Sequence, residues 1–137
     1  MGPHFNFTSW CDSWLLTSGT NFIHPIIEYT EDKKVKSFSI NQTFNEFGQN
    51  QLRRQKLDIA FFDASYNQHT LKSVILSDSQ NMNHINISSL EPISYKAIVM
   101  NYGDYAYDVV FYDENTLSNL ENDLYMIKDY LTRMMVW

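Results

Sequence analysis

Four histidines are the residues of this chain best suited to bind a metal, but their spacing does not favour a metal site. They are His4, His24, His69 and His84. No two of them lie three or four positions apart, so no pair can project from one face of a helix as imidazoles do in a common type of zinc site. A site assembled from distant segments is the alternative. We predict no metal ligands and no bound cofactor.

Cys11, the only cysteine, is the one candidate for a thiol nucleophile. Paired with a distant histidine, it would supply a nucleophile and a base. It falls between Trp10 and Trp14 in a predicted helix, however, where a thiol usually serves as an inert packing group. The sequence lacks a Gly-x-Ser-x-Gly turn, a phosphate-binding loop and a dinucleotide fingerprint. We therefore predict a non-catalytic chain with no catalytic or cofactor-binding residues.

Acidic residues near the C-terminal end invite a calcium or carboxylate-pair interpretation. They are Asp104, Asp108, Asp113 and Glu114. Their spacing does not match an EF-hand loop. Structural roles fit better, because Asp104 falls in a predicted turn and the last two precede a predicted helix, where negative charge is favourable.

Net charge bears on the class of partner. Ten basic and sixteen acidic residues give a net charge of −6, which argues against nucleic acid. The one basic cluster, at residues 53–56, is interpreted as a solvated loop. Most tyrosines and phenylalanines alternate within predicted strands, so they are assigned to the core. Trp10 and Trp14 are likewise predicted to pack and not to form a ligand platform.

Helical patterns flank the chain. Trp10, Trp14 and Leu15 share one face of a first helix, which Thr8 or Ser9 would cap. Near the other end, apolar residues recur every three or four positions, with Asn115 or Thr116 as the predicted N-cap. The members of this stripe are Leu117, Leu120, Leu124, Ile127 and Leu131. The second helix is expected to be interrupted near residues 128–129.

Between the helical segments, short β-branched and aromatic runs alternate with polar turns, as strands do. The predicted strands are 26–30, 35–40, 56–63, 70–77, 84–87, 95–100 and 105–112. A charged turn at 31–34 makes the first two a hairpin, and the loop at 44–54 is long enough to cross between sheets. The expected fold is mainly β: an antiparallel β-sandwich of about seven strands with a flanking helix at each end.

The flanking segments carry a family resemblance. The chain is similar, in order and spacing, to aminopeptidase N-type zinc metallopeptidases. The similar blocks are Trp10-x-x-x-Trp14-Leu15-x-Thr17-x-Gly19-x-Asn21-x-x-x-Pro25, the strand at 57–63, Met100 to Tyr107 with Phe111-Tyr112-Asp113-Glu114, and Tyr130 to Trp137. The resemblance covers nearly the whole chain from residue 7. It implies the small β-sandwich domain that lies between the catalytic domain and the C-terminal helical domain.

The resemblance also implies a division of the chain. Residues 1–4 are interpreted as an added leader. Residues 5–24 would be a helix and linker that end the catalytic domain, 25–113 the β-sandwich, and 114–137 the start of the helical domain. The family's His-Glu-x-x-His zinc motif and its Gly-x-Met-Glu-Asn motif are absent from this sequence. No catalytic residue of the family can therefore be carried over, and zinc is implied only for the parent enzyme.

The expected partners follow from this division. They are the neighbouring catalytic and helical domains of the parent, with self-association through the apolar segment 134–137 as a further expectation. The alternative is a free-standing sandwich that binds carbohydrate or protein through exposed aromatic residues. No apolar run of about 18 residues occurs, so no membrane span is expected. No signal peptide is visible, and together with the single cysteine this favours a cytoplasmic location.

Overall fold

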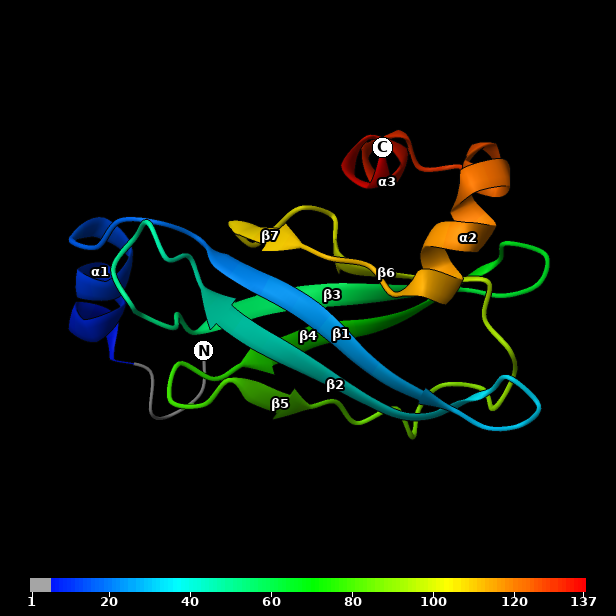
Figure 1. Ribbon diagram of the computed structural model, residues 1–137, viewed down its shortest axis with the longest axis horizontal. Helices are drawn as coiled ribbons and strands as arrows, with labels where there is room; N and C mark the ends of the chain where they lie inside the picture. The colour runs from blue at the N-terminus through cyan, green and yellow to red at the C-terminus, as the bar shows by residue number, and fades with distance from the viewer. Residues whose placement is uncertain (1–5) are drawn as a thin grey trace.

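The computed structural model describes residues 6–137, so the predicted leader at 1–4 lies outside the described residues. The chain folds into a mainly β structure with helices on both flanks (Figure 1). The elements are α1 (Phe7–Leu15), β1 (Asn21–Tyr29), β2 (Val35–Phe44), β3 (Gln55–Phe62), β4 (Gln68–Leu76), β5 (Met82–His84), β6 (Ala97–Tyr102), β7 (Asp108–Val110), α2 (Glu114–Asp123), the 3-10 turn η1 (Leu124–Met126) and α3 (Tyr130–Val136). Of the helices within 6–137, none combines the length and hydropathy that crossing a bilayer requires.

The N-cap of helix α1 lies two to three residues before the predicted caps. Asn6 is the N-cap, and its Oδ1 accepts a hydrogen bond of 3.1 Å from the Ser9 amide. The prediction of Thr8 or Ser9 was wrong, because asparagine fills this role equally well and stands two residues before Thr8. None of the nine residues of α1 is buried. The helix is therefore held by its end and not by its face.

Strand β1 begins at Asn21, which is four residues before the predicted boundary at residue 25. The Asn21 side chain donates from Nδ2 to the Gln51 carbonyl at 2.8 Å and accepts from the Arg53 amide at 2.8 Å. Ile23 is fully buried. These long-range contacts draw residues 21–24 into the strand. The predicted hairpin to β2 is confirmed, with Lys33 at a φ of 59° in its turn.

Seven strands of the described chain form two sheets, in the orders β5-β2-β1-β7 and β4-β3-β6. All pairings are antiparallel except that of β1 with β7, which is parallel. The sheets are thus mostly antiparallel, as expected, and the pair of β1 with β7 is the exception. Strand β7 follows β6 of the other sheet through a crossing connection, so no tight hairpin forces it to be antiparallel. The loop after β2 also crosses between the sheets, as predicted.

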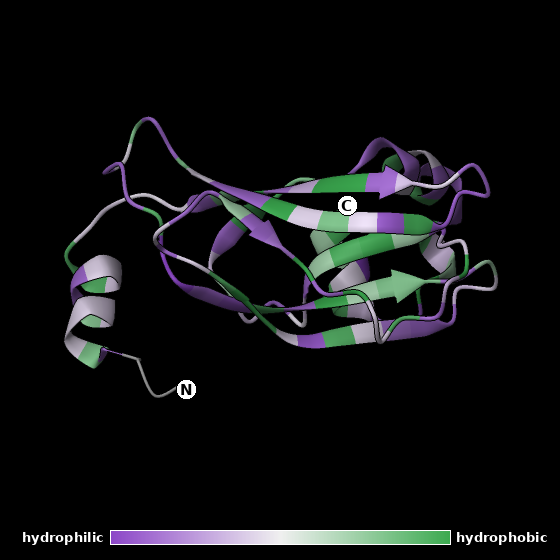
Figure 2. Ribbon diagram, turned by 90° about the horizontal axis from the view of Figure 1, so that it is seen from below, coloured by the Kyte–Doolittle hydropathy of each residue, from purple (hydrophilic) through white to green (hydrophobic). Residues whose placement is uncertain are grey.

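The main core lies between the two sheets. Residues of both sheets contribute buried side chains to it: Ile23, Phe38 and Ile40 from the first, and Leu57, Ile59, Phe61, Leu71, Leu76, Ile98 and Met100 from the second. Figure 2 shows hydrophobic residues concentrated along the strands, with polar residues in many connecting loops. Alternation along the strands therefore places one face of each sheet inside.

A second cluster covers the outer face of the three-stranded sheet. Its buried members are Ala60, Phe62, Ala97, Val99, Leu120 and Ile127. Helix α2 also protects the free edge of β6, because Thr116 Oγ1 accepts a 2.9 Å hydrogen bond from the Ile98 amide. The N-cap of α2 is Asp113, and not Asn115 or Thr116 as predicted. Thr116 is occupied at the sheet edge, which leaves the capping role to the aspartate.

Candidate functional site

The histidines of the described chain lie at three separate places. His24 stacks on Phe111 with ring centroids 4.3 Å apart, and His84 Nδ1 lies 2.8 Å from Ser39 Oγ. His69 Nε2 is 3.5 Å from an oxygen of Asp63. His4 lies outside the described residues. Among residues 6–137, no group of three or more His, Cys, Asp and Glu side chains is placed to hold a metal ion.

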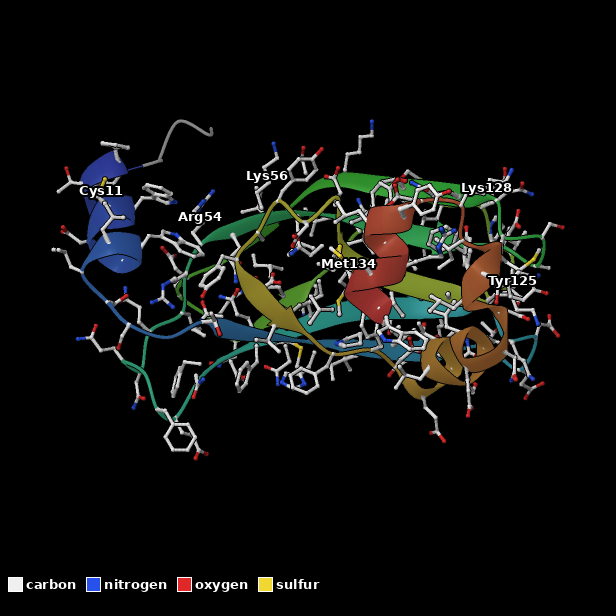
Figure 3. All side chains as sticks on the ribbon, turned by 90° about the horizontal axis from the view of Figure 1, so that it is seen from above. Cys11, Arg54, Lys56, Tyr125, Lys128 and Met134 are labelled. Carbon is white, nitrogen blue, oxygen red and sulfur yellow. The ribbon has the colours of Figure 1, made fainter. Side chains whose placement is uncertain are left out.

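Cys11 is half-buried on α1, beside the two tryptophans. Trp10 is more exposed than a packing group should be, whereas Trp14 is half-buried and contacts Arg53. Figure 3 places Cys11 on the helix at one end of the long axis of the molecule. The thiol is therefore on a peripheral element and not within either core.

The four acidic residues singled out in the sequence do not form one site. Asp113 caps α2 and accepts a 3.0 Å hydrogen bond from the Tyr29 hydroxyl, and Glu114 lies in the first turn of that helix. Asp104 lies in a turn at a φ of 54°. Asp108 Oδ2 is buried without a hydrogen-bond partner, as Asp113 Oδ1 also is. Burial raises the pKa of Asp108 to about 7, opposed by the Asn101 hydrogen bond and assisted by the charge of Asp104.

The basic cluster at 53–56 is not the solvated loop that we predicted. Arg53 and Gln55 are buried, whereas Arg54 and Lys56 are exposed. Figure 3 shows Lys56 pointing away from the sheets. Arg53 and Gln55 are buried at alternate positions, and the same alternation continues into β3, where Leu57 is the next buried residue. That alternation is the signal in the sequence that could have identified Arg53.

Arg53 is the most connected polar residue at the α1 end of the molecule. Its Nε donates to the Ser13 carbonyl at 2.8 Å, and its Nη2 donates to Thr17 Oγ1 at 2.6 Å. The guanidinium also lies 5.3 Å from the centre of the Trp14 ring. Desolvation by burial lowers the pKa of Arg53. The side chain thus ties the C-terminal end of α1 to the sheets.

A buried amide network surrounds the backbone of Arg53. Gln42 Nε2 donates to the Arg53 carbonyl at 2.9 Å and to the Ser77 carbonyl at 3.2 Å. Gln55 Nε2 donates to Gln42 Oε1 at 3.0 Å. Buried amides are costly unless they are hydrogen-bonded, so this network specifies how the loops at this end of the sheets are joined. The sequence offered no signal for it, because the partners are up to 35 residues apart.

Apolar side chains are exposed on α1 and on a neighbouring loop. Leu15 is 72% exposed, and Phe7 and Leu16 are also exposed. Phe47, in the loop after β2, is 98% exposed. That loop contacts the linker after α1, where the Gln49 amide donates to the Ser18 carbonyl at 3.3 Å. We call α1 together with residues 44–47 the N-terminal surface.

The C-terminal segment forms a second apolar surface. An open groove of about 740 Å³ lies between α2 and α3, lined by Tyr112, Glu114, Leu117, Ser118, Leu120, Glu121, Leu124, Val136 and Trp137. Met134 is 68% exposed and Trp137 is 96% exposed. Val136 instead packs against the second cluster. Only part of the apolar segment at 134–137 therefore faces outward, whereas all of it was expected to face a partner. We call the groove together with Met134 the C-terminal surface.

Comparison with known proteins adds no relative, because no family model matches this chain and no curated protein matches it. The resemblance to zinc aminopeptidases thus stays a prediction that depends on the residues quoted for it.

Proposed function

We propose that the chain is a non-catalytic interdomain module of a zinc-dependent aminopeptidase, whose parent enzyme would remove N-terminal residues from peptides. In this proposal the two sheets are the family's β-sandwich of about seven strands. The observation that carries the proposal is the exposure of large apolar side chains on α1 and α3, the helices nearest the two ends of the described chain. These are the places where the neighbouring domains would attach.

Helix α1 argues most strongly for a missing partner. Phe7 and Leu15 are exposed, and no residue of the helix is buried in the described chain. Burying one large apolar side chain is worth roughly 1.5–3 kcal/mol, so several exposed ones favour contact with another surface. In the proposed parent, α1 belongs to the end of the catalytic domain, which would cover this face.

The N-terminal and C-terminal surfaces lie on different parts of the molecule, as a module that separates two neighbouring domains requires. Helix α1 lies at one end of the long axis, whereas α3 lies over the other half of the molecule (Figures 1 and 3). The sheets between them share one core. Such a unit would hold its two neighbours at a fixed separation, which is the work we assign to it.

Zinc belongs to the parent in this proposal. There it would activate water for attack on the peptide bond. The described residues of this chain do not supply a suitable ligand group, so no step of that chemistry is assigned to them.

The coding sequence upstream provides the first test. We expect it to encode a His-Glu-x-x-His segment roughly 150–250 residues earlier, on the scale of one further domain. An open reading frame that lacks this motif would overturn the proposal. The observation requires no folded protein, so it is independent of any effect on stability.

The chain on its own provides the second test. After dialysis, elemental analysis is expected to find no stoichiometric zinc, and aminoacyl reporter substrates are expected to remain uncleaved. One tightly held zinc per chain would contradict the proposal. So would turnover that survives repurification and is abolished by His69→Ala.

Surface variants of the full-length protein provide the third test. Leu15→Asp with Leu16→Asp should loosen the attachment of the preceding domain, seen as faster limited proteolysis between the domains. Lys36→Asp, on the exposed part of β2, is the matched control and should have no effect. The leucines are exposed in the chain described here, so the variants should not unfold it. Unchanged proteolysis in the leucine variants would contradict an interface at α1.

The alternative function is a carbohydrate-binding module. Tyr105 and Tyr107 are exposed side chains that could stack on sugar rings. Saturation-transfer NMR with a panel of neutral oligosaccharides tests this alternative. Binding that is lost in Tyr105→Ala with Tyr107→Ala would favour it over the interdomain module.

A further inference from the structure

Helix α1 is joined to the sheets at one point. It buries no residue of its own, and no strand of the described chain packs broadly against it. The linker that follows is fixed from the Ser18 carbonyl onward, which accepts a hydrogen bond from the Gln49 amide. Gly19 and Gly48 pack backbone to backbone, since a Cβ on Gly48 would lie 3.0 Å from Gly19 Cα. Any change in the direction of α1 must therefore pivot at residues 16–18.

Arg53 spans this pivot from a rigid base. Its amide donates to Asn21 Oδ1 of β1 at 2.8 Å, and its carbonyl accepts from Gln42 Nε2 of β2 at 2.9 Å. The backbone of Arg53 is thus tied to two strands of the first sheet at the start of β3. Its side chain extends from this base to α1.

The far end of the side chain bonds one carbonyl in the last turn of the helix and the two linker residues after its C-cap. Nε reaches the Ser13 carbonyl, and Nη2 reaches Thr17 Oγ1 and, at 3.4 and 3.3 Å, the carbonyls of Thr17 and Ser18. Carbonyls at a helix C-terminus carry a partial negative charge, so they suit a guanidinium. The Trp14 ring adds a cation–π contact at 5.3 Å.

The acceptors of the Arg53 guanidinium are all neutral, so its buried charge is compensated by hydrogen bonds alone. No carboxylate is among the hydrogen-bond partners recorded for Arg53 in residues 6–137. A buried charge without a counter-ion recovers its desolvation cost only while its full set of hydrogen bonds is made. The arrangement therefore favours one orientation of α1 over partly detached ones.

We propose that Arg53 is a positioning residue that latches α1 in one direction relative to the two sheets. Removal of the latch leaves α1 free to swing about residues 16–18 while both sheets stay folded. The inference concerns this chain alone, so it stands independently of the proposed aminopeptidase function. If that function holds, the latch sets the angle at which the preceding domain joins the sheets.

Distances between two spin labels, measured by double electron–electron resonance, test the proposed role of Arg53 directly. Cys11 is the only cysteine and lies on α1, so one label can be attached there and a second at Lys36→Cys on β2. The labelled chain that retains Arg53 should give one narrow distance distribution. Arg53→Met should broaden it roughly twofold or more, as expected when a locally held element opens. Hydrogen exchange at Ile23, Ile40 and Ile59 should show that the sheets remain protected.

Arg54→Met is the matched control. Arg54 is the exposed neighbour, so its replacement removes the same charge and should leave the distribution narrow. Thr17→Val removes one acceptor of Arg53, together with the hydrogen bond that Thr17 Oγ1 donates to the Ser13 carbonyl. It does not alter the sheets and should give an intermediate width. If Arg53→Met fails to fold, the Thr17→Val distribution tests the proposal in its place. An unchanged narrow distribution in Thr17→Val, or in a folded Arg53→Met, would overturn the proposal.

Discussion

Asn101 Nδ2 donates a 3.1 Å hydrogen bond to Asp108 Oδ1, while the other oxygen of the same carboxyl is buried without a partner. Asn101 also closes the turn before β7, because its side chain bonds both the amide and the carbonyl of Ala106. One neutral amide therefore provides the polar contact of a mostly buried acid. An ionised Asp108 is poorly compensated in this position.

Protein stability should consequently fall as pH rises through the range set by Asp108. Burial raises its pKa from 3.8 to about 7, so the folded chain retains a proton that the unfolded chain releases. The free energy of unfolding should decrease between about pH 4 and pH 7 and level off above. The full shift corresponds to at most ~4 kcal/mol, and partial exposure of the carboxyl reduces this.

Asp108→Asn should remove this pH dependence. The substitution keeps the shape of the side chain and cannot ionise, so the variant should be more stable than the natural chain at pH 8 by roughly 1–3 kcal/mol. Urea denaturation at pH 4.5 and pH 8 measures the difference. Asp104→Asn should act in the same direction but more weakly, because it removes only a neighbouring charge. Equal pH profiles for the natural chain and Asp108→Asn would contradict the prediction.

Thr116→Val should destabilise the packing of α2 on β6. The substitution preserves volume but removes the oxygen that accepts from the Ile98 amide, leaving a buried donor unpaired at a cost of about 1–3 kcal/mol. Thermal unfolding of the variant should show a lower midpoint. Ser118→Ala on the exposed face of α2 is the control and should change stability by less than about 0.5 kcal/mol.

Gly48→Ala should be costly although the residue lies in a loop. A Cβ there would come within 2.9 Å of the Ser18 carbonyl oxygen, so the linker or the loop must move. Overpacking of this kind costs about 1–3 kcal/mol. The neighbouring Phe47→Ala should cost less than about 0.5 kcal/mol, because Phe47 is fully exposed. Denaturation curves of the two variants that coincide would show that the Gly19–Gly48 contact is dispensable.

The exposed C-terminal residues should make the chain self-associate. Met134 and Trp137 present apolar surface that the described chain does not cover. Sedimentation velocity is expected to show concentration-dependent association, opposed only weakly by the net charge of −6, since screening acts within about 8 Å at physiological salt. Met134→Ser with Trp137→Ser should weaken the association and leave stability unchanged. A natural chain that stays monomeric at every concentration would contradict this expectation.

Local periodicity was sufficient to predict much of the fold. Alternating apolar residues identified most of the strands, and the three-to-four spacing of Leu120, Leu124 and Ile127 identified the C-terminal helical segment, whose interruption near residue 128 is confirmed. These patterns are reliable because one side of each element must be buried. Capping was less predictable, since Asn6, Thr8 and Ser9 are all suitable N-caps.

The tertiary structure alone decided the parallel pairing of β7, the early start of β1 and the burial of Arg53. The pairing and the early start depend on contacts between segments distant in sequence, which periodicity does not record. For Arg53, the alternation of β3 indicates the buried side but not the partners that would compensate its charge. Arg53 is the clearest case. Its charge and its neighbours Arg54 and Lys56 indicated a solvated loop, yet one carbonyl of α1 and two of the following linker lie where the guanidinium can replace its lost water. The sequence determined which residues could be buried, and the position of the α1 C-terminal end beside residue 53 determined that this arginine was.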